Sequence, residues 1–343
     1  MKDRRLFAAG SYSSRGGPGI RVFSLQNERL EPLYDVDAPD PLWLTLSEDR
    51  RHLYAACGGE GPEEGFIRSY TPVDGFEHGM RLEAEQPAHG VCPCHLALCG
   101  GDLISANYAS GSVSVFPLRN GVPQPMAQQF RHVGRSVDKR RQAGPHVHQV
   151  LPLDVDAFLA QDLGLDRLIH YRKAGNTWEK VREYPVPAGA GPRHAVVFGN
   201  MLYLATELSS RLLVYRMEGY ALFLLQAWEL PGWPVDTLNY PAAIRLSPEG
   251  KTLAVSCRGA DAVAFFSVGP DGLLDPEECL PIPGCWPRDI HLLDSRTTLC
   301  ASQKSGDVTL LRRQNGTFEA LSALPMPGAV AIVEIGGKDG EKR

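Results

Sequence analysis

Two short phrases of the sequence combine histidine and arginine with a Gly-Pro turn. Residues 141–150 read RQAGPHVHQV and place His146 and His148 two positions apart, while residues 188–197 read AGAGPRHAVV and contain Arg193 and His194. A histidine can serve as a general base near neutral pH, and an arginine fork binds carboxylate, phosphate or an oxyanion. The pair of phrases therefore indicates acid-base chemistry on an anionic substrate.

A metal site is the alternative for the two histidines, because residues two apart on a strand project to the same side. The sequence offers no obvious third ligand, so we predict no metal and no organic cofactor. We expect His148 to act as a base or hydrogen-bond donor. His146 suits a packing or turn role and His194 a structural one, and both are also candidate substrate-binding residues.

The elements that carry these phrases repeat along the chain. Short alternating apolar runs are separated by turn residues, as in YPAAIRLSPEGKTLAVSCRG, and the same order of strand, hairpin and strand recurs six times. The prolines that open the six modules stand 46 to 52 residues apart, which is the length of a propeller blade. They are Pro41, Pro93, Pro145, Pro192, Pro241 and Pro287.

A seventh module is split between the two ends of the chain. LFAAGSYSS and IRVFSL near the N-terminus supply its middle strands, and PGAVAIVEI (residues 327–335) supplies its innermost strand. Joining the ends in one blade removes the open sheet edges of the ring. We therefore predict an all-β fold: one seven-bladed β-propeller domain of residues 1–343, closed by N- and C-terminal strands in one blade. An eight-bladed ring or a β-solenoid is the alternative.

Strand order within a blade brings further polar residues to the same face, because the second strand ends where the first one starts. The predicted column at the second-strand ends contains Tyr108, Asp162, Glu207, Arg258 and Gln303, and Arg288 joins the strand starts. Buried polar groups are costly unless they are paired or wetted, so their coincidence predicts a ligand site. The competing interpretation is a set of solvated loop residues in which Glu207 merely pairs with arginine.

Bulk properties narrow the class of protein. The net charge is −5, which provides no global field for nucleic acid, and no apolar run approaches the 18 residues that cross a bilayer. We expect a soluble cytoplasmic protein with reduced cysteines. Cys92 and Cys94 lack a second metal-ligand pair and suit turn and strand packing. The basic segment 131–142 ends at Arg141, which is placed to receive a carboxylate or phosphate.

These phrases resemble those of the seven-bladed propeller lactonases, which include propeller-type 6-phosphogluconolactonases and fungal carboxy-cis,cis-muconate cyclases. The resemblance covers essentially the whole chain, and its more specific pieces are RQAGPHVHQV, GAGPRHAVV, YPAAIRLSPEGKTLAVSCRG and ANYASGSVSVFPL. The resemblance implies that the active residues are His148, Arg193, Glu207 and Arg258. The chain departs from the family pattern where Asn is usual, with Thr206, Cys257 and Ser302 in its place.

The expected activity is hydrolysis of a small anionic sugar-acid lactone, such as 6-phosphogluconolactone, in carbohydrate metabolism. His148 would activate water, and Glu207 would orient His148 or act as a second acid or base. Arg193 and Arg258 would hold the oxyanion or acid group, and Arg141 would receive a phosphate. A muconate-type cycloisomerase and a non-catalytic binding propeller are the alternatives. The mostly charged column differs from the aromatic clusters of protein-binding surfaces.

Overall fold

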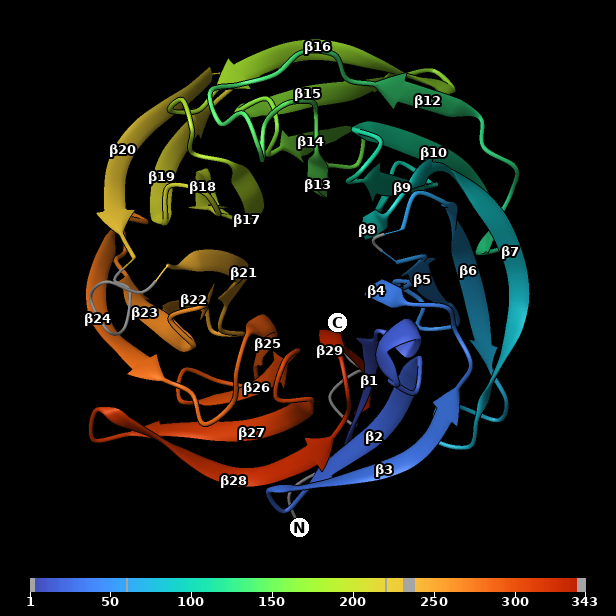
Figure 1. Ribbon diagram of the computed structural model, residues 1–343. Helices are drawn as coiled ribbons and strands as arrows, with labels where there is room; N and C mark the ends of the chain where they lie inside the picture. Colours follow the sequence, from blue (N-terminus) through green and yellow to red (C-terminus); the bar gives the residue numbers. More distant parts are fainter. Residues whose placement is uncertain (1–3, 60, 220, 231–237, 338–343) are drawn as a thin grey trace.

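Seven antiparallel sheets are arranged as blades around a common axis (Figure 1). The computed structural model describes residues 4–59, 61–219, 221–230 and 238–337. Within these ranges the regular structure is β-strand, apart from the 3-10 turn η1 (Ser13–Arg15). The prediction of an all-β seven-bladed propeller is confirmed.

One blade is assembled from both ends of the chain, with the strand order β29-β1-β2-β3. The C-terminal strand β29 (Ala329–Gly337) is innermost and pairs antiparallel with β1 (Arg5–Ser11), followed by β2 (Ile20–Gln26) and β3 (Arg29–Val36). The Nη2 atom of Arg5 lies 2.6 Å from Oε2 of Glu334 across this pair. The predicted closure of the ring is therefore confirmed, and both ends of the described chain lie on this blade in Figure 1.

The other six blades follow one another along the chain, each from its inner to its outer strand. The first two contain β4 (Pro41–Leu46), β5 (Leu53–Cys57), β6 (Glu64–Pro72) and β7 (Met80–Val91), then β8 (Pro93–Cys99), β9 (Asp102–Asn107), β10 (Ser112–Arg119), β11 (Val122–Pro123) and β12 (Gln128–Arg131). The next two contain β13 (Val147–Asp154), β14 (Ala157–Asp162), β15 (Arg167–Ala174) and β16 (Thr177–Pro185), then β17 (Pro192–Phe198), β18 (Met201–Thr206), β19 (Arg211–Glu218) and β20 (Ala221–Glu229). The last two contain β21 (Tyr240–Leu246), β22 (Thr252–Arg258), β23 (Ala262–Val268) and β24 (Leu274–Pro281), then β25 (Pro287–Leu292), β26 (Thr297–Ser302), β27 (Asp307–Gln314) and β28 (Thr317–Pro325).

The structure refines the predicted modules in two places. β13 begins at Val147, two residues after Pro145, and the outer edge of the β8–β12 blade is divided, since β10 pairs with both β11 and β12. The long segment that follows β12 carries the basic residues of 131–142 back to the inner end of β13. This segment therefore brings Arg141 to the same end of the ring as His148.

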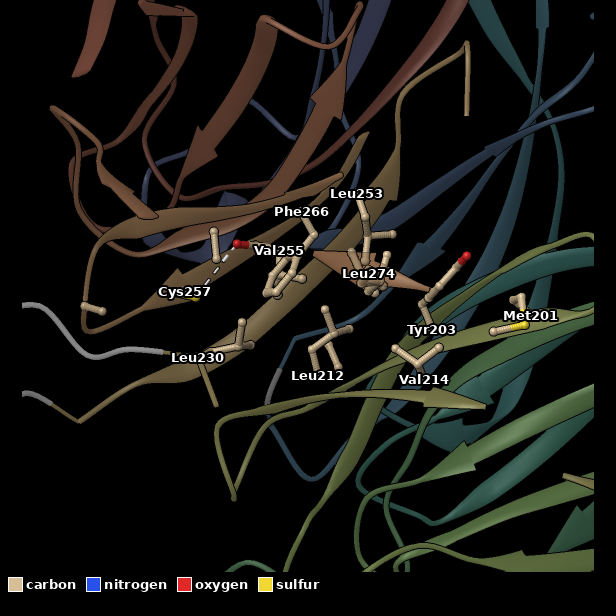
Figure 2. Packing of buried hydrophobic residues seen from close by; sticks show 14 residues of the cluster. Met201, Tyr203, Leu212, Val214, Leu230, Leu253, Val255, Cys257, Phe266 and Leu274 are labelled. Atoms are coloured by element: carbon tan, nitrogen blue, oxygen red, sulfur yellow. Dashed lines mark hydrogen bonds between the residues drawn. The ribbon is translucent and has the colours of Figure 1, made fainter. Parts of the chain in front are cut away.

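Apolar faces of neighbouring blades pack against each other and hold the ring together. Between the β17–β20 and β21–β24 blades, alternate residues of β18 and β22 meet, including Met201, Tyr203, Leu253 and Val255 (Figure 2). The hydroxyl of Tyr203 donates to the carbonyl of Gly272 at 2.9 Å, so its one polar atom is satisfied. Fully burying one such aliphatic side chain contributes about 1.5–3 kcal/mol. These contacts fix the spacing of the strands that carry the site.

Every blade also has a register irregularity near the start of its innermost strand. In six blades one residue is left out of the ladder between two paired neighbours, and in β21 the shift lies between Pro241 and Ile244. Such bulges release a side chain from the alternation of the strand and re-aim it, often beside functional sites. The residues left out are Leu42, Cys94, His148, Arg193, Arg288 and Val330.

Candidate active site

Glu207 is the centre of a buried ionic cluster that joins two blades and the basic segment. Its Oε2 accepts hydrogen bonds from Arg193 Nε at 3.0 Å and Arg258 Nη2 at 2.6 Å, and its Oε1 accepts one from Arg141 Nη2 at 2.5 Å. Arg193 is the second residue of β17, Glu207 directly follows β18, and Arg258 ends β22 of the next blade. We call Arg141, Arg193, Arg258 and Glu207 the arginine cluster.

The arginine cluster carries more positive than negative charge in a buried place. Arg193 is 2% exposed and Glu207 is 4% exposed, yet three guanidinium groups share one carboxylate. Nη1 of Arg193 is buried without a hydrogen-bond partner among the described residues. Because buried charges are normally paired and hydrogen-bonded, the excess charge and the unused donor fit an anionic ligand.

Electrostatics keep Glu207 ionised. Burial alone would raise the pKa of its carboxyl group, but the positive charges of Arg258 and Arg193 outweigh this effect and hold the pKa below its usual value. Burial and the charge of Arg258 lower the pKa of Arg193 to about 9, which still leaves the guanidinium protonated at neutral pH. The carboxylate therefore remains an acceptor that orients the arginines.

His148 lies beside this cluster in a packed group of rings. The ring centroids of Tyr108 and His194 are 5.4 Å and 5.1 Å from that of His148, both in edge-to-face geometry. Cys94 Sγ lies 4.0 Å from His148 Nδ1 and also donates to the His148 carbonyl oxygen. Burial, followed by the charge of Arg193, holds the pKa of His148 well below its usual range. His148 is therefore a neutral imidazole at physiological pH.

Tyr108 connects the histidines to the arginine cluster. Arg141 Nη2 donates to the Tyr108 hydroxyl at 3.3 Å, and the ring of His146 stacks on Tyr108 with a centroid distance of 4.6 Å. His146 Nδ1 donates to the carbonyl oxygen of Tyr108 at 3.0 Å. His146 is therefore held against Tyr108, and the predicted residues Tyr108, His146, His148 and Arg141 are brought together.

Arg288 and Gln303 form a second group on the β25–β28 blade. Arg288 Nη1 donates to Tyr12 Oη at 2.9 Å and to Gln303 Oε1 at 3.2 Å. The positive charge of Arg288 acts on both His148 and Arg193, so this group lies within electrostatic range of the arginine cluster.

Asp162 stands one register position away from the column in which the sequence places it. The backbone N–H of Glu207 donates to the carbonyl oxygen of Gly191, the residue just before the innermost strand of its blade. In the β13–β16 blade the matching hydrogen bond runs from Leu163 to the carbonyl oxygen of His146, so Leu163, and not Asp162, is equivalent to Glu207. Asp162 is fully buried, and its Oδ2 lies 2.6 Å from His132 Nδ1. Its Oδ1 accepts the backbone N–H groups of His146 and Leu165. Because neighbouring residues of a strand face opposite sides, the offset of one residue turns Asp162 away from the arginine cluster.

A group of rings that the sequence analysis did not identify lies against His194. Trp43 stacks on His95 with a centroid distance of 4.2 Å, and the rings of both stand edge-on to His194. Both ring nitrogens of His194 are buried without a hydrogen-bond partner in the described chain. The phrase PCH at residues 93–95 occupies the same strand positions as PRH at 192–194. This similarity in the sequence could have indicated that His95 lies near His194.

The chemical capability of the site follows from these groups. A neutral imidazole can accept a proton from water, and guanidinium groups can stabilise negative charge that develops on a substrate oxygen. Within the described residues, no group of three or more His, Cys, Asp or Glu side chains has the arrangement of a metal site. No helix in that part of the chain is long and apolar enough to cross a membrane.

Fold and site together define a β-propeller with a positively charged cluster of arginines at the inner ends of its blades. The chain belongs to the family described as Lactonase, 7-bladed beta-propeller, which it matches over residues 7–333. It is 27% identical over 329 residues to a 6-phosphogluconolactonase of Bacillus subtilis (strain 168), covering 92% of this chain and 93% of that protein.

Solved structures agree with this assignment. The periplasmic gluconolactonase of Pseudomonas aeruginosa superposes with a TM-score of 0.90 at 27% identity, covering 97% of this chain and 99% of that one. A protein from Lactobacillus plantarum superposes with a TM-score of 0.86 at 25% identity, covering 96% and 99% of the two chains. The family resemblance expected from the sequence is confirmed.

Proposed function

We propose that the protein hydrolyses a sugar-acid lactone, with 6-phosphogluconolactone as the leading substrate. The observation that carries the proposal is the surplus of guanidinium groups around Glu207, two of them buried, with Nη1 of Arg193 left unpartnered. Lactone hydrolysis produces a tetrahedral oxyanion and then a carboxylate, and both are bound by such donors. The names of the Bacillus subtilis and Pseudomonas aeruginosa relatives support the same reaction.

The roles that we propose follow the geometry. His148 removes a proton from water, the resulting hydroxide adds to the lactone carbonyl, and Arg193 Nη1 donates to the oxyanion. The acyl C–O bond of the ring then breaks, and the leaving alkoxide takes up a proton to give the hydroxy acid. Glu207 acts as a positioning residue, because both of its oxygens are already bound by arginines. This role differs from the alternative expectation that Glu207 serves as a second acid or base.

The product of this reaction, 6-phosphogluconate, would place the protein in the pentose phosphate pathway of carbohydrate metabolism. A small-molecule lactone or carboxylate is the proposed ligand, without nucleic acid. A cytoplasmic location stays a prediction, since one structural relative is described as periplasmic. The residues proposed for catalysis are His148, Arg193 and Arg258, and Glu207 positions the arginines. Arg141, Tyr108, His146 and His194 lie beside them, and Arg288 and Gln303 belong to the β25–β28 blade.

The direct test is hydrolysis of freshly prepared 6-phosphogluconolactone, followed by proton release and corrected for the spontaneous rate. The assay is repeated after dialysis against a chelator, because the proposal needs no metal. We expect turnover well above background in both conditions. A rate equal to the spontaneous one would overturn the proposal, and turnover of an unsaturated dicarboxylate in its place would favour the cycloisomerase alternative.

A further inference from the structure

Trp286 holds a backbone conformation that is unfavourable for its residue type. It immediately precedes β25, and its φ is +67°, in the left-handed region that bulky side chains rarely adopt. Four other blades have a left-handed residue at the corresponding position before the innermost strand: Asp40, Cys92, Gly191 and Gly328. Five of the seven blades therefore share this conformation, and glycine adopts it in two of them without steric cost. A tryptophan at such a position points to a use for its side chain.

Two positively charged side chains lie near the indole of Trp286, at the edge of the arginine cluster. Lys304 Nζ lies 3.4 Å from the indole centroid, and Arg258 Cζ lies 5.7 Å from it. Tyr240 approaches the same ring with a centroid distance of 6.1 Å. A cation over an indole face is attracted by the negative charge of the π-system. The indole therefore fixes the position of the Lys304 ammonium next to a residue that already binds Glu207.

Lys304 is exposed and forms no ion pair with any residue that the structure describes. Two acidic groups at this end of the blades are engaged with other partners. Asp261 Oδ1 accepts the backbone N–H of Trp286 at 2.7 Å, and Glu207 is bound by three arginines. An ammonium held in place without a carboxylate partner is a suitable point charge for a phosphate group.

Arg141 is less suited to that task than the sequence suggests. Its Nη2 donates to both Glu207 and the Tyr108 hydroxyl, and the carboxylate of Asp138 accepts the backbone N–H groups of Arg140 and Arg141. The Arg141 guanidinium is thus committed to the arginine cluster. The Lys304 ammonium has no comparable commitment to an anion.

We propose that Trp286 and Lys304 form a second anion subsite, which takes the terminal phosphate of a phosphorylated sugar acid while the arginine cluster takes its carboxyl end. The inference rests on the proposed function and deepens it, because it makes the phosphate a determinant of specificity. Trp286 acts by holding the ammonium, and Lys304 contacts the phosphate. Substrates without a phosphate use the arginine cluster alone.

Binding of the two hydrolysis products tests the subsite without reference to turnover. Calorimetry compares 6-phosphogluconate with gluconate on the wild type, Lys304→Met and Trp286→Gly. We expect both variants to bind 6-phosphogluconate at least about tenfold more weakly, a usual effect for a lost charge-assisted contact, with gluconate binding changed less than about twofold. Lys251→Met is the matched control, because Lys251 is exposed on the turn between β21 and β22, at the other end of that blade.

Melting temperature separates a binding role from a structural one. Glycine relieves the left-handed strain, so Trp286→Gly should melt at the same or a higher temperature while it loses phosphate affinity. Equal weakening of both ligands, or unchanged 6-phosphogluconate binding in Lys304→Met, would overturn the subsite. Hydrolysis of 6-phosphogluconolactone and glucono-δ-lactone provides the parallel kinetic comparison. A wild type that hydrolyses neither lactone refutes the proposed function, and the product-binding comparison still decides the subsite.

Discussion

Glu207 Oε2 lies 2.6 Å from Arg258 Nη2, and this contact joins two neighbouring blades at their inner ends. Glu207 follows β18 and Arg258 ends β22, so a single ion pair spans the boundary that the apolar side chains of Figure 2 fill further along the same strands. The side chains of the pair are only 5% and 9% exposed. The site and the packing between the blades therefore depend on the same two strands.

Replacing the central carboxylate should destabilise the protein. Glu207→Gln keeps the shape of the side chain but removes the charge that neutralises three arginines, and breaking a buried pair in this way typically costs about 3–5 kcal/mol. We expect a clearly lower free energy of unfolding in urea and a loss of lactone hydrolysis. Glu229→Gln is the matched control, because Glu229 pairs with Arg211 on the surface and is 80% exposed. Equal stability of the two variants would contradict the central role of Glu207.

Replacing Arg193 should affect activity more than stability. Arg193→Met retains most of the buried volume, and Arg258 and Arg141 still neutralise Glu207. Loss of one oxyanion donor commonly lowers turnover by about 10²–10³-fold, and a readily hydrolysed lactone should show a smaller loss. Hydrolysis rate and melting temperature are measured on the same samples. Unchanged hydrolysis with a sharply lower melting temperature would assign Arg193 a purely structural role.

The ring and its closure could be predicted from the sequence because the repeated phrases mark equivalent positions in successive blades. The same repetition predicts that Arg193, Glu207 and Arg258 lie close together, since strand starts and second-strand ends share one end of a blade. Similarity of the phrases also failed once, at Asp162. Its phrase LAQDLG resembles LATELS, but the backbone hydrogen bond from Leu163 sets the register of this blade. Similarity of short sequence segments does not reveal that hydrogen bond.

Features that depend on backbone conformation were not readable from residue types. The bulge that leaves His148 out of the ladder and the left-handed φ of Trp286 arise from how each innermost strand enters its blade. Likewise, the contact of Lys304 with Trp286 joins residues from two different strand ends. Sequence spacing therefore predicts which residues lie near one another, whereas only the three-dimensional structure shows which side chains are bound to one another.

The new position of Asp162 leads to a separate prediction. Asp162→Asn should weaken the contact with His132 and lower the free energy of unfolding by about 1–3 kcal/mol, as expected for a buried hydrogen-bonded charge. Because Asp162 faces away from the arginine cluster, kcat/KM should change by less than about threefold, or roughly 0.7 kcal/mol. Chemical denaturation and initial rates provide the two readouts. A large loss of kcat/KM in a stable variant would return Asp162 to the substrate site.

Protein stability should fall in mild acid because three buried histidines are held neutral. Burial is the main cause that keeps the pKa values of His95, His148 and His194 well below the usual range, and the charge of Arg193 adds to it for all three. In the unfolded chain each imidazole titrates near its ordinary pKa of about 6.5. As the pH drops below that value, the unfolded state binds protons that the folded state does not bind. The contribution of these histidines to stability, which is fully present above pH 6.5, is therefore progressively lost.

The expected slope is about 1.4 kcal/mol per pH unit for each histidine, or about 4 kcal/mol per pH unit for three. Urea denaturation between pH 7.5 and 5 measures it, with ionic strength held constant. His95→Phe should keep the stacking on Trp43 and reduce the slope by about 1.4 kcal/mol per pH unit, because one titrating group is removed. His78→Phe, at an exposed site, is the control for the replacement of a histidine by phenylalanine. A stability that is constant over this range would show that the buried imidazoles accept protons in the folded protein, and a neutral His148 could then no longer be assigned as the base.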